Sequence, residues 1–102
     1  SGCYLQGING IEIGDNTIFA PGVKIISANH NQDDLNLHIK TNPIKIGKGC
    51  WIGTNAVILP GVQLGDNVKV GAGSVVTKSF GNNATIVGVP AKIINGLIKE
   101  VV

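Results

Sequence analysis

A six-residue period runs through most of the chain and restricts its fold more than any other feature. We write the sequence in hexads from Ser1, with a break after His30 and a restart at Ile46. The first position is then large and apolar in nine of eleven hexads. The fourth position is Gly or Asn in eight of eleven, namely Gly10, Asn16, Gly22, Gly49, Asn55, Gly61, Asn67 and Gly73.

This pattern has a direct structural meaning. Gly and Asn accept a positive φ at little cost, so the fourth position predicts a left-handed corner. A corner every six residues leaves only short β segments, whose first-position side chains point inward and stack on those of the next coil. Smaller fifth-position residues fill the remaining space. We therefore predict an all-β solenoid, a parallel β-helix with three hexads per coil and three to four coils.

Residues 31–45, NQDDLNLHIKTNPIK, fit no hexad and predict an external loop. Insertions in solenoids are often placed on the binding face, and a long loop in a compact domain is more often functional than neutral. With a period of eighteen, we expect His30 to share a face with Gln63 and Gly81, and Trp51 to point outward from the adjacent face. The loop is expected to leave the corner between these two faces.

The same pattern predicts the domain organisation. We expect one repeat domain over residues 1–95, carrying the external loop 31–45, followed by a C-terminal cap segment, 96–102. From Ala91 the repeat fades into apolar residues that could form an end strand or a short helix. A chain that starts at Ser1 and contains no Met is expected to be a fragment or a processed form.

Composition excludes several classes of protein. A hydrophobic fraction of 43% with only 14% charged residues argues against disorder. The net charge of +2 without a basic cluster argues against a nucleic-acid surface. There is no apolar run of the ~20 residues that would span a bilayer. Two cysteines and no signal-peptide pattern predict a reducing, cytoplasmic location.

Three short motifs carry a resemblance to a known family. They are the NH pair before the insertion, WIG at 51–53 after it, and GAGSVVTK followed by GVPAK at 71–78 and 88–92. Across residues 11–95 the chain resembles the hexapeptide-repeat acetyltransferases, nearest the galactoside, maltose and xenobiotic acetyltransferase branch. The resemblance implies a left-handed β-helix, although parallel crossovers are generally right-handed. It also implies a homotrimer with sites between subunits.

The implied activity is transfer of an acetyl group from acetyl-CoA to a hydroxyl of a sugar or polysaccharide unit, with no metal. His30 matches the catalytic histidine of the family, and a side chain that titrates near neutrality suits a general base. Asn29, Asp33 and Asp34 are candidates for orienting that base and binding the acceptor. Cys50 is expected to face inward, so we predict direct transfer without a covalent intermediate.

The resemblance also implies a coenzyme path along the prism. Trp51 would pack beside the pantetheine arm, and Lys92 stands where relatives often carry an arginine near the phosphates. A second basic position of the family is Asn95 here, which weakens the phosphate clamp. The predicted coenzyme contacts are Trp51, Gly53, Thr54, Ala72, Thr77, Lys78 and Lys92.

Three other functions fit parts of the pattern. The acceptor could instead be the amine of an amino sugar or the hydroxyl of serine. The chain could also be a non-catalytic solenoid, with polar acceptor-binding residues missing upstream. A γ-class carbonic anhydrase on the same fold would need three histidine ligands, and the sequence contains two, His30 and His38.

Overall fold

The computed structural model describes residues 4–6, 10–27, 29–30, 38–39 and 42–94. All of its regular elements within these ranges are short strands. They are β1 (Tyr4–Gln6), β2 (Ile11–Ile13), β3 (Ile18–Phe19), β4 (Lys24–Ile26), β5 (Asn29–His30), β6 (His38–Ile39), β7 (Ile44–Ile46), β8 (Trp51–Ile52), β9 (Val57–Ile58), β10 (Gln63–Leu64), β11 (Lys69–Val70), β12 (Val75–Val76), β13 (Thr85–Gly88) and β14 (Ala91–Ile93).

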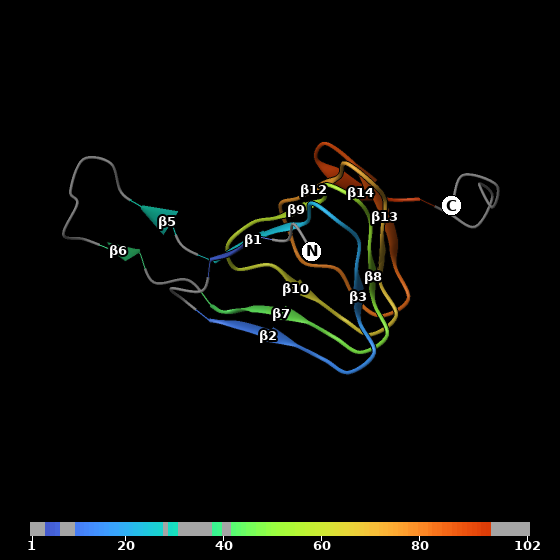
Figure 1. Ribbon diagram of the computed structural model, residues 1–102, viewed down its shortest axis with the longest axis horizontal. Helices are drawn as coiled ribbons and strands as arrows, with labels where there is room; N and C mark the ends of the chain where they lie inside the picture. Colours follow the sequence, from blue (N-terminus) through green and yellow to red (C-terminus); the bar gives the residue numbers. More distant parts are fainter. Residues whose placement is uncertain (1–3, 7–9, 28, 31–37, 40–41, 95–102) are drawn as a thin grey trace.

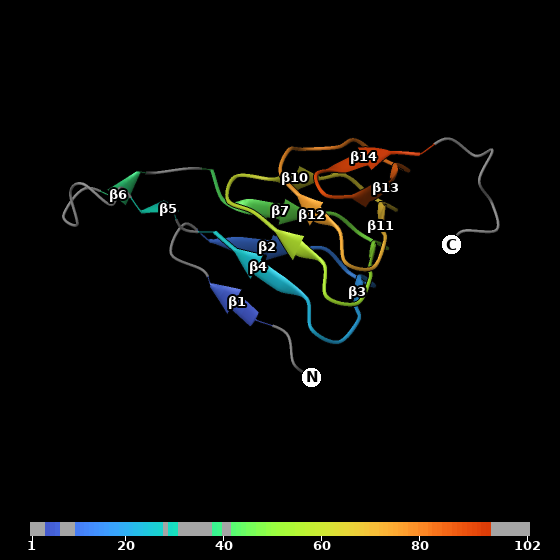
Figure 2. The same cartoon turned by 90° about the horizontal axis from the view of Figure 1, so that it is seen from above.

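All of these strands except β5 and β6 belong to three sheets that enclose a triangular prism (Figure 1). We name each sheet after one of its strands. The β4 sheet has the order β1-β4-β9-β12, the β7 sheet has the order β10-β7-β2, and the β8 sheet has the order β14-β13-β11-β8-β3. The chain visits the β7, β8 and β4 sheets in turn, and successive coils stack with parallel pairing (Figure 2). The predicted parallel β-helix with three hexads per coil is therefore confirmed.

The corners of the prism follow the Gly/Asn pattern closely. All eight predicted corner residues have a positive φ, between 58° at Asn67 and 90° at Gly10. Asn83 and Gly88 also have positive φ, although the hexad count did not include them. The left-handed corner is thus a local property that residue type determines, because only Gly and Asn adopt it without strain.

The interior of the prism is filled by the first and fifth hexad positions. First-position Ile25, Ile52 and Ile58 are fully buried, and the fifth-position Cys50 is buried as predicted. Ile13 is an exception with 41% exposure, because β2 is the edge strand of its sheet and only β7 packs against it. Stacking of like positions between coils therefore makes one continuous apolar core.

The hexad phase fails at both ends of the prism. Ile25 pairs with Leu5, whereas the hexad frame would pair it with Gly7. At the other end, the peptide N–H of Asp66 donates to Asn82 across a spacing of 16, whereas Lys48 donates to Asp66 across the regular spacing of 18. The first coil is therefore longer and the last coil shorter than the repeat predicts.

The insertion keeps the register of the coils. Ile13 pairs with Ile46 and Phe19 with Ile52, as a restart of the hexads at Ile46 predicts. The insertion ends earlier than predicted, because Ile44 already belongs to β7, where it is buried and pairs with Ile11 of β2. β5, just before the predicted insertion, and β6, inside it, form an antiparallel pair that projects from the prism (Figure 1).

The predicted location of His30 is wrong. Gln63 pairs with Lys45, and its peptide N–H donates to Ser79 Oγ at 2.8 Å, so neither His30 nor Gly81 is its neighbour. The insertion leaves the coil directly after the β4 strand, before the chain reaches the β7 sheet. Lys45 then occupies the place on that sheet that the hexad frame gave to His30.

The C-terminal part of the described chain ends in a strand rather than a helix. β14 pairs antiparallel with β13, with Val87 opposite Lys92. The predicted cap, 96–102, lies outside the described residues. In the part of the chain that the structure describes, no helix is long and apolar enough to cross a membrane.

Candidate functional site

Trp51 projects outward from β8, which lies between β3 and β11 in its sheet. Its register partners are Ile18 on one side and Lys69 on the other, as the eighteen-residue period predicts. The following residue, Ile52, is fully buried, so alternation along the strand directs the indole away from the core. Trp51 remains 42% exposed, and an exposed tryptophan of this kind indicates a surface that another molecule covers.

A cavity of about 160 Å³ lies beside Trp51 on the outer surface of the β8 sheet. We call it the Trp51 cavity; its lining residues are Trp51, Lys69, Val70, Gly71, Ala72, Thr85, Val87 and Ile94. The surface is hollow here because Gly71 and Ala72 lack long side chains between the larger residues of neighbouring strands. The cavity spans strands from β8 toward β14, parallel to the axis of the prism.

Gly53 and Thr54 continue from Trp51 around the corner between the β8 and β4 sheets. A Cβ on Gly53 would lie 2.7 Å from the peptide nitrogen of Ala72 and 2.8 Å from the carbonyl oxygen of Val70. Thr54 is exposed, and its carbonyl accepts a hydrogen bond from the N–H of Gly73 at 2.8 Å. Close contact between coils therefore requires glycine at position 53, whether or not a coenzyme binds there.

Lys92 reaches the same surface from the end strand. It is exposed and pairs directly with Val87, which lines the Trp51 cavity. Residues directly opposite each other in antiparallel strands project to the same side of the sheet. The structure therefore brings together Trp51, Gly53, Ala72 and Lys92 on or beside one face.

Thr77 and Lys78 do not belong to this group. They follow β12 and precede Phe80, which bridges to Leu64, so they lie at the corner between the β4 and β7 sheets. Both are exposed, and Lys78 Nζ lies 5.9 Å from the centre of the Phe80 ring. The insertion leaves the prism at this same corner, which we call the insertion corner.

Asn29 and His30 form β5 of the projecting hairpin, with His30 in register with His38. Asp33 and Asp34 lie outside the described residues. The prediction that His30 and Trp51 flank the base of the insertion is wrong, since Figure 1 shows the hairpin and β8 on opposite sides of the prism. The physical reason is chain order: β7 lies between the insertion and β8, so Trp51 is one sheet further along.

The sequence-based prediction of the site also missed several residues. Thr85, Val87 and Ile94 line the Trp51 cavity, but the shortened last coil shifts them out of the hexad frame. Lys69 could have been found from its spacing of eighteen from Trp51. In the described ranges no group of three or more His, Cys, Asp or Glu side chains could hold a metal ion.

The fold and the repeat define the class of protein. Residues 43–78 match the family model described as bacterial transferase hexapeptide (six repeats). The left-handed form of the parallel β-helix is the fold of its structural neighbours, as the resemblance implied. The chain belongs to the hexapeptide-repeat family, and its relatives include galactoside and maltose O-acetyltransferases.

Three comparisons illustrate the relationship. Galactoside O-acetyltransferase of Escherichia coli K12 is 41% identical over 87 residues, which cover 82% of this chain and 43% of the relative. The structure of a galactoside acetyltransferase in complex with coenzyme A superposes with a TM-score of 0.84 and 37% identity, covering 96% of this chain and 50% of that one. AntD, an N-acyltransferase from Bacillus cereus in complex with dTDP and 3-hydroxybutyryl-CoA, gives a TM-score of 0.81 and 27% identity, covering 90% and 55%.

The chain therefore spans about half the length of the relatives that it matches.

Proposed function

We propose that this chain is the repeat module of an acetyl-CoA-dependent O-acetyltransferase that acts on a hydroxyl of a sugar or polysaccharide unit. The observation that carries the proposal is the Trp51 cavity, an open hollow on the β8 sheet with Trp51 and Ala72 in its lining. Its lining includes Trp51 and Ala72, two of the seven residues that the resemblance implies as coenzyme contacts. The coenzyme A complex of a galactoside acetyltransferase, which matches 96% of this chain, gives further support.

The cavity has the properties that an extended pantetheine arm requires. Trp51, Val87 and Ile94 supply apolar contact, while the small residues Gly71 and Ala72 leave room for the arm between them. Ligand sites commonly combine an apolar lining with a few polar groups. In this proposal Trp51, Gly53, Thr54 and Ala72 contact the arm, and Lys92 lies toward the phosphates.

The reaction is a direct transfer in a ternary complex. His30 takes the proton of the acceptor hydroxyl as its oxygen attacks the thioester carbonyl. The carbon–sulfur bond then breaks, the acetyl group stays on the acceptor oxygen, and the coenzyme thiolate takes up a proton. Cys50 takes no part, because it is buried, with Sγ 3.1 Å from the carbonyl oxygen of Gly65. Asn29, Asp33 and Asp34 orient the base and bind the acceptor.

We further propose a homotrimer whose sites lie between subunits. Within one chain, the predicted site residues fall into two separate groups, one at a corner of the prism and one on a face. His30, Thr77 and Lys78 belong to the insertion corner, whereas Trp51 and Ala72 lie on the β8 sheet. A site that needs both groups is completed when the insertion corner of one copy faces the β8 sheet of the next, which a closed ring of three provides.

A mixing experiment tests this arrangement. His30→Ala removes the base, and Ala72→Trp fills the Trp51 cavity, so each variant alone should be inactive. Random reassembly of equal amounts should restore about one quarter of the wild-type activity, because that fraction of interfaces combines an intact hairpin with an intact cavity. Recovery is measured as thiol release from acetyl-CoA after joint refolding. Reassembled trimers without activity would exclude a site shared between subunits.

The activity and acceptor are tested by the same assay on the unmixed protein. We expect release of coenzyme A thiol in the presence of galactosides or other sugars, and slower release with amino sugars or serine. Faster turnover with an amino sugar would replace the O-acetyl proposal by N-acylation, which a relative such as AntD performs. Tight binding of acetyl-CoA without turnover on any acceptor would identify a non-catalytic solenoid.

The remaining sequence-based predictions belong to this proposal. We propose one repeat domain over residues 1–95, with 96–102 as its cap. The use of acetyl-CoA, a cytoplasmic metabolite, is the reason for proposing a cytoplasmic location. No metal takes part in the proposed mechanism, because a histidine base suffices for acetyl transfer to a hydroxyl.

A further inference from the structure

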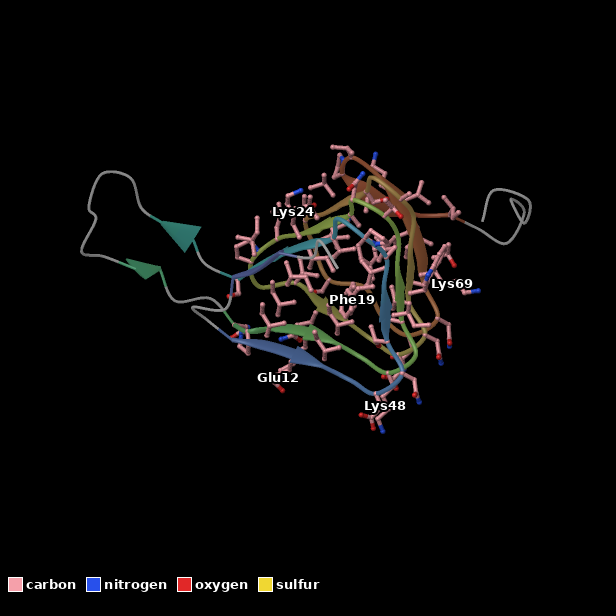
Figure 3. The ribbon with its side chains drawn as sticks, in the orientation of Figure 1. Glu12, Phe19, Lys24, Lys48 and Lys69 are labelled. Atoms are coloured by element: carbon pink, nitrogen blue, oxygen red, sulfur yellow. The ribbon has the colours of Figure 1, made fainter. Side chains whose placement is uncertain are left out.

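Besides Lys92, the outer surface of the β8 sheet carries a second lysine, Lys69, next to Trp51. Lys69 is exposed on β11 and pairs with Trp51 on one side and with Thr85 on the other. The next residue, Val70, is fully buried, so the Lys69 side chain must leave the sheet on its outer surface. Figure 3 shows Lys69 pointing away from the prism, whereas Phe19 of the same sheet points inside. Lys69 also lines the Trp51 cavity.

Lys92 stands on the same surface, across β13 from Lys69. The two lysines pair with different residues of β13, Lys69 with Thr85 and Lys92 with Val87. Thr85 and Val87 both line the cavity and have the buried Ile86 between them, so they project to the same outer side. β11 and β14 each lie one strand from β13, and neighbouring strands are about 4.8 Å apart. Two flexible lysine side chains therefore reach the space above β13.

The strands that carry the two lysines offer no carboxylate to neutralise them. Within the described residues, the five strands of the β8 sheet include no Asp or Glu. Lys69 lines the cavity and Lys92 stands beside it, opposite the lining residue Val87. Two ammonium groups on one surface repel each other, and an anion placed between them removes that repulsion. The charge pattern therefore favours a phosphate-bearing ligand over a neutral one.

We propose that Lys69 joins Lys92 in binding a phosphate group of the coenzyme. Lys69 would supply the second positive charge that the family pattern places at position 95, where this sequence has Asn95. A lysine acts as a point charge without the bidentate fork of arginine, so two of them on opposite sides of β13 give a clamp that neither forms alone. This inference rests on the proposed function, because it takes coenzyme A as the occupant of the Trp51 cavity.

Calorimetric titration of the full chain with coenzyme A tests the role of Lys69. Lys69→Gln should weaken binding about fivefold at low ionic strength, the contribution of one charge-assisted contact at a partly exposed position. Lys69→Arg should bind as tightly as the wild type. Lys45→Gln is the matched control, because Lys45 is an exposed mid-strand lysine on the β7 sheet.

Titration with 3′-dephospho-CoA distinguishes the two phosphate sources. If the loss in Lys69→Gln persists with this ligand, Lys69 binds the diphosphate; if the loss disappears, it binds the 3′-phosphate. Equal affinity of Lys69→Gln and wild type for coenzyme A at low salt would overturn the inference while leaving the proposed function intact. A change in oligomeric state without a change in affinity would overturn it too, and would assign Lys69 to a subunit contact. Absence of coenzyme binding by the wild type would instead refute the proposed function itself.

Discussion

Replacement of His30 by alanine is expected to lower kcat for acetyl transfer by about 10²–10⁴-fold, the usual contribution of a positioned general base. Coenzyme A affinity should change little, because the lining of the Trp51 cavity, which holds the coenzyme in the proposed site, does not include His30. Such a separation of kcat from binding identifies a group that acts in the transition state. Steady-state thiol release and calorimetric titration of coenzyme A measure the two quantities.

His38→Ala is the matched control for this experiment. His38 faces His30 in the register of the β5–β6 pair, so either substitution perturbs the same hairpin. We expect His38→Ala to retain kcat, because only His30 matches the catalytic position of the family. Comparable losses in both variants would assign His30 a structural role in the hairpin. Full activity in His30→Ala would refute the proposed mechanism.

Replacement of Gly53 by alanine is expected to lower the free energy of unfolding by about 2–3 kcal/mol, at the upper end of the range for overpacked sites. The new Cβ would lie 2.7 Å from the peptide nitrogen of Ala72 and 2.8 Å from the carbonyl oxygen of Val70. Backbone of the next coil cannot move away without weakening the hydrogen bond from Gly53 N–H to Val70, which measures 2.8 Å. Urea unfolding at fixed protein concentration measures the loss.

Gly81→Ala is the control for the stability experiment. A Cβ on Gly81 meets nothing within 4 Å, and Gly81 is absent from the glycines with positive φ. Its substitution should leave stability unchanged or raise it by about 0.4–1 kcal/mol, because alanine restricts the unfolded chain. If Gly81→Ala destabilised the protein as much as Gly53→Ala, the loss would reflect a general intolerance of the coils rather than contact at position 53.

The repeat allowed much of the fold to be predicted, because each hexad position has its own physical requirement. The positive φ of Asn55 and the burial of Ile52 and Cys50 depend on residue type within a few residues of sequence. The insertion was also predicted from the interruption of the pattern. The point at which the insertion leaves the prism could not be predicted, because the hexad frame does not reveal where within a hexad the chain leaves the coil.

The prediction of the candidate site was less complete for a similar reason. Trp51 and Lys69 are neighbours through the period of eighteen, which is regular in the middle of the chain. Thr85 and Ile94 join the same cavity only because the last coil is shorter and the end strand turns back antiparallel. The last coil is two residues shorter than the regular coils, and composition gives no sign of this. The polar corner residues around Ser79 and Asn82 are compatible with either coil length.

The sequence by itself determined the solenoid, its three-sided section and its corners, since these follow from the conformational preferences of Gly and Asn and from burial of every sixth aliphatic residue. Only the tertiary structure decided which face each functional residue occupies. Trp51 and the histidine hairpin lie on opposite sides of one prism, although only 21 positions (51 − 30) separate Trp51 from His30 in the sequence. The reason is geometric: the insertion leaves the prism after β4, and the chain crosses the β7 sheet before it reaches Trp51 in β8.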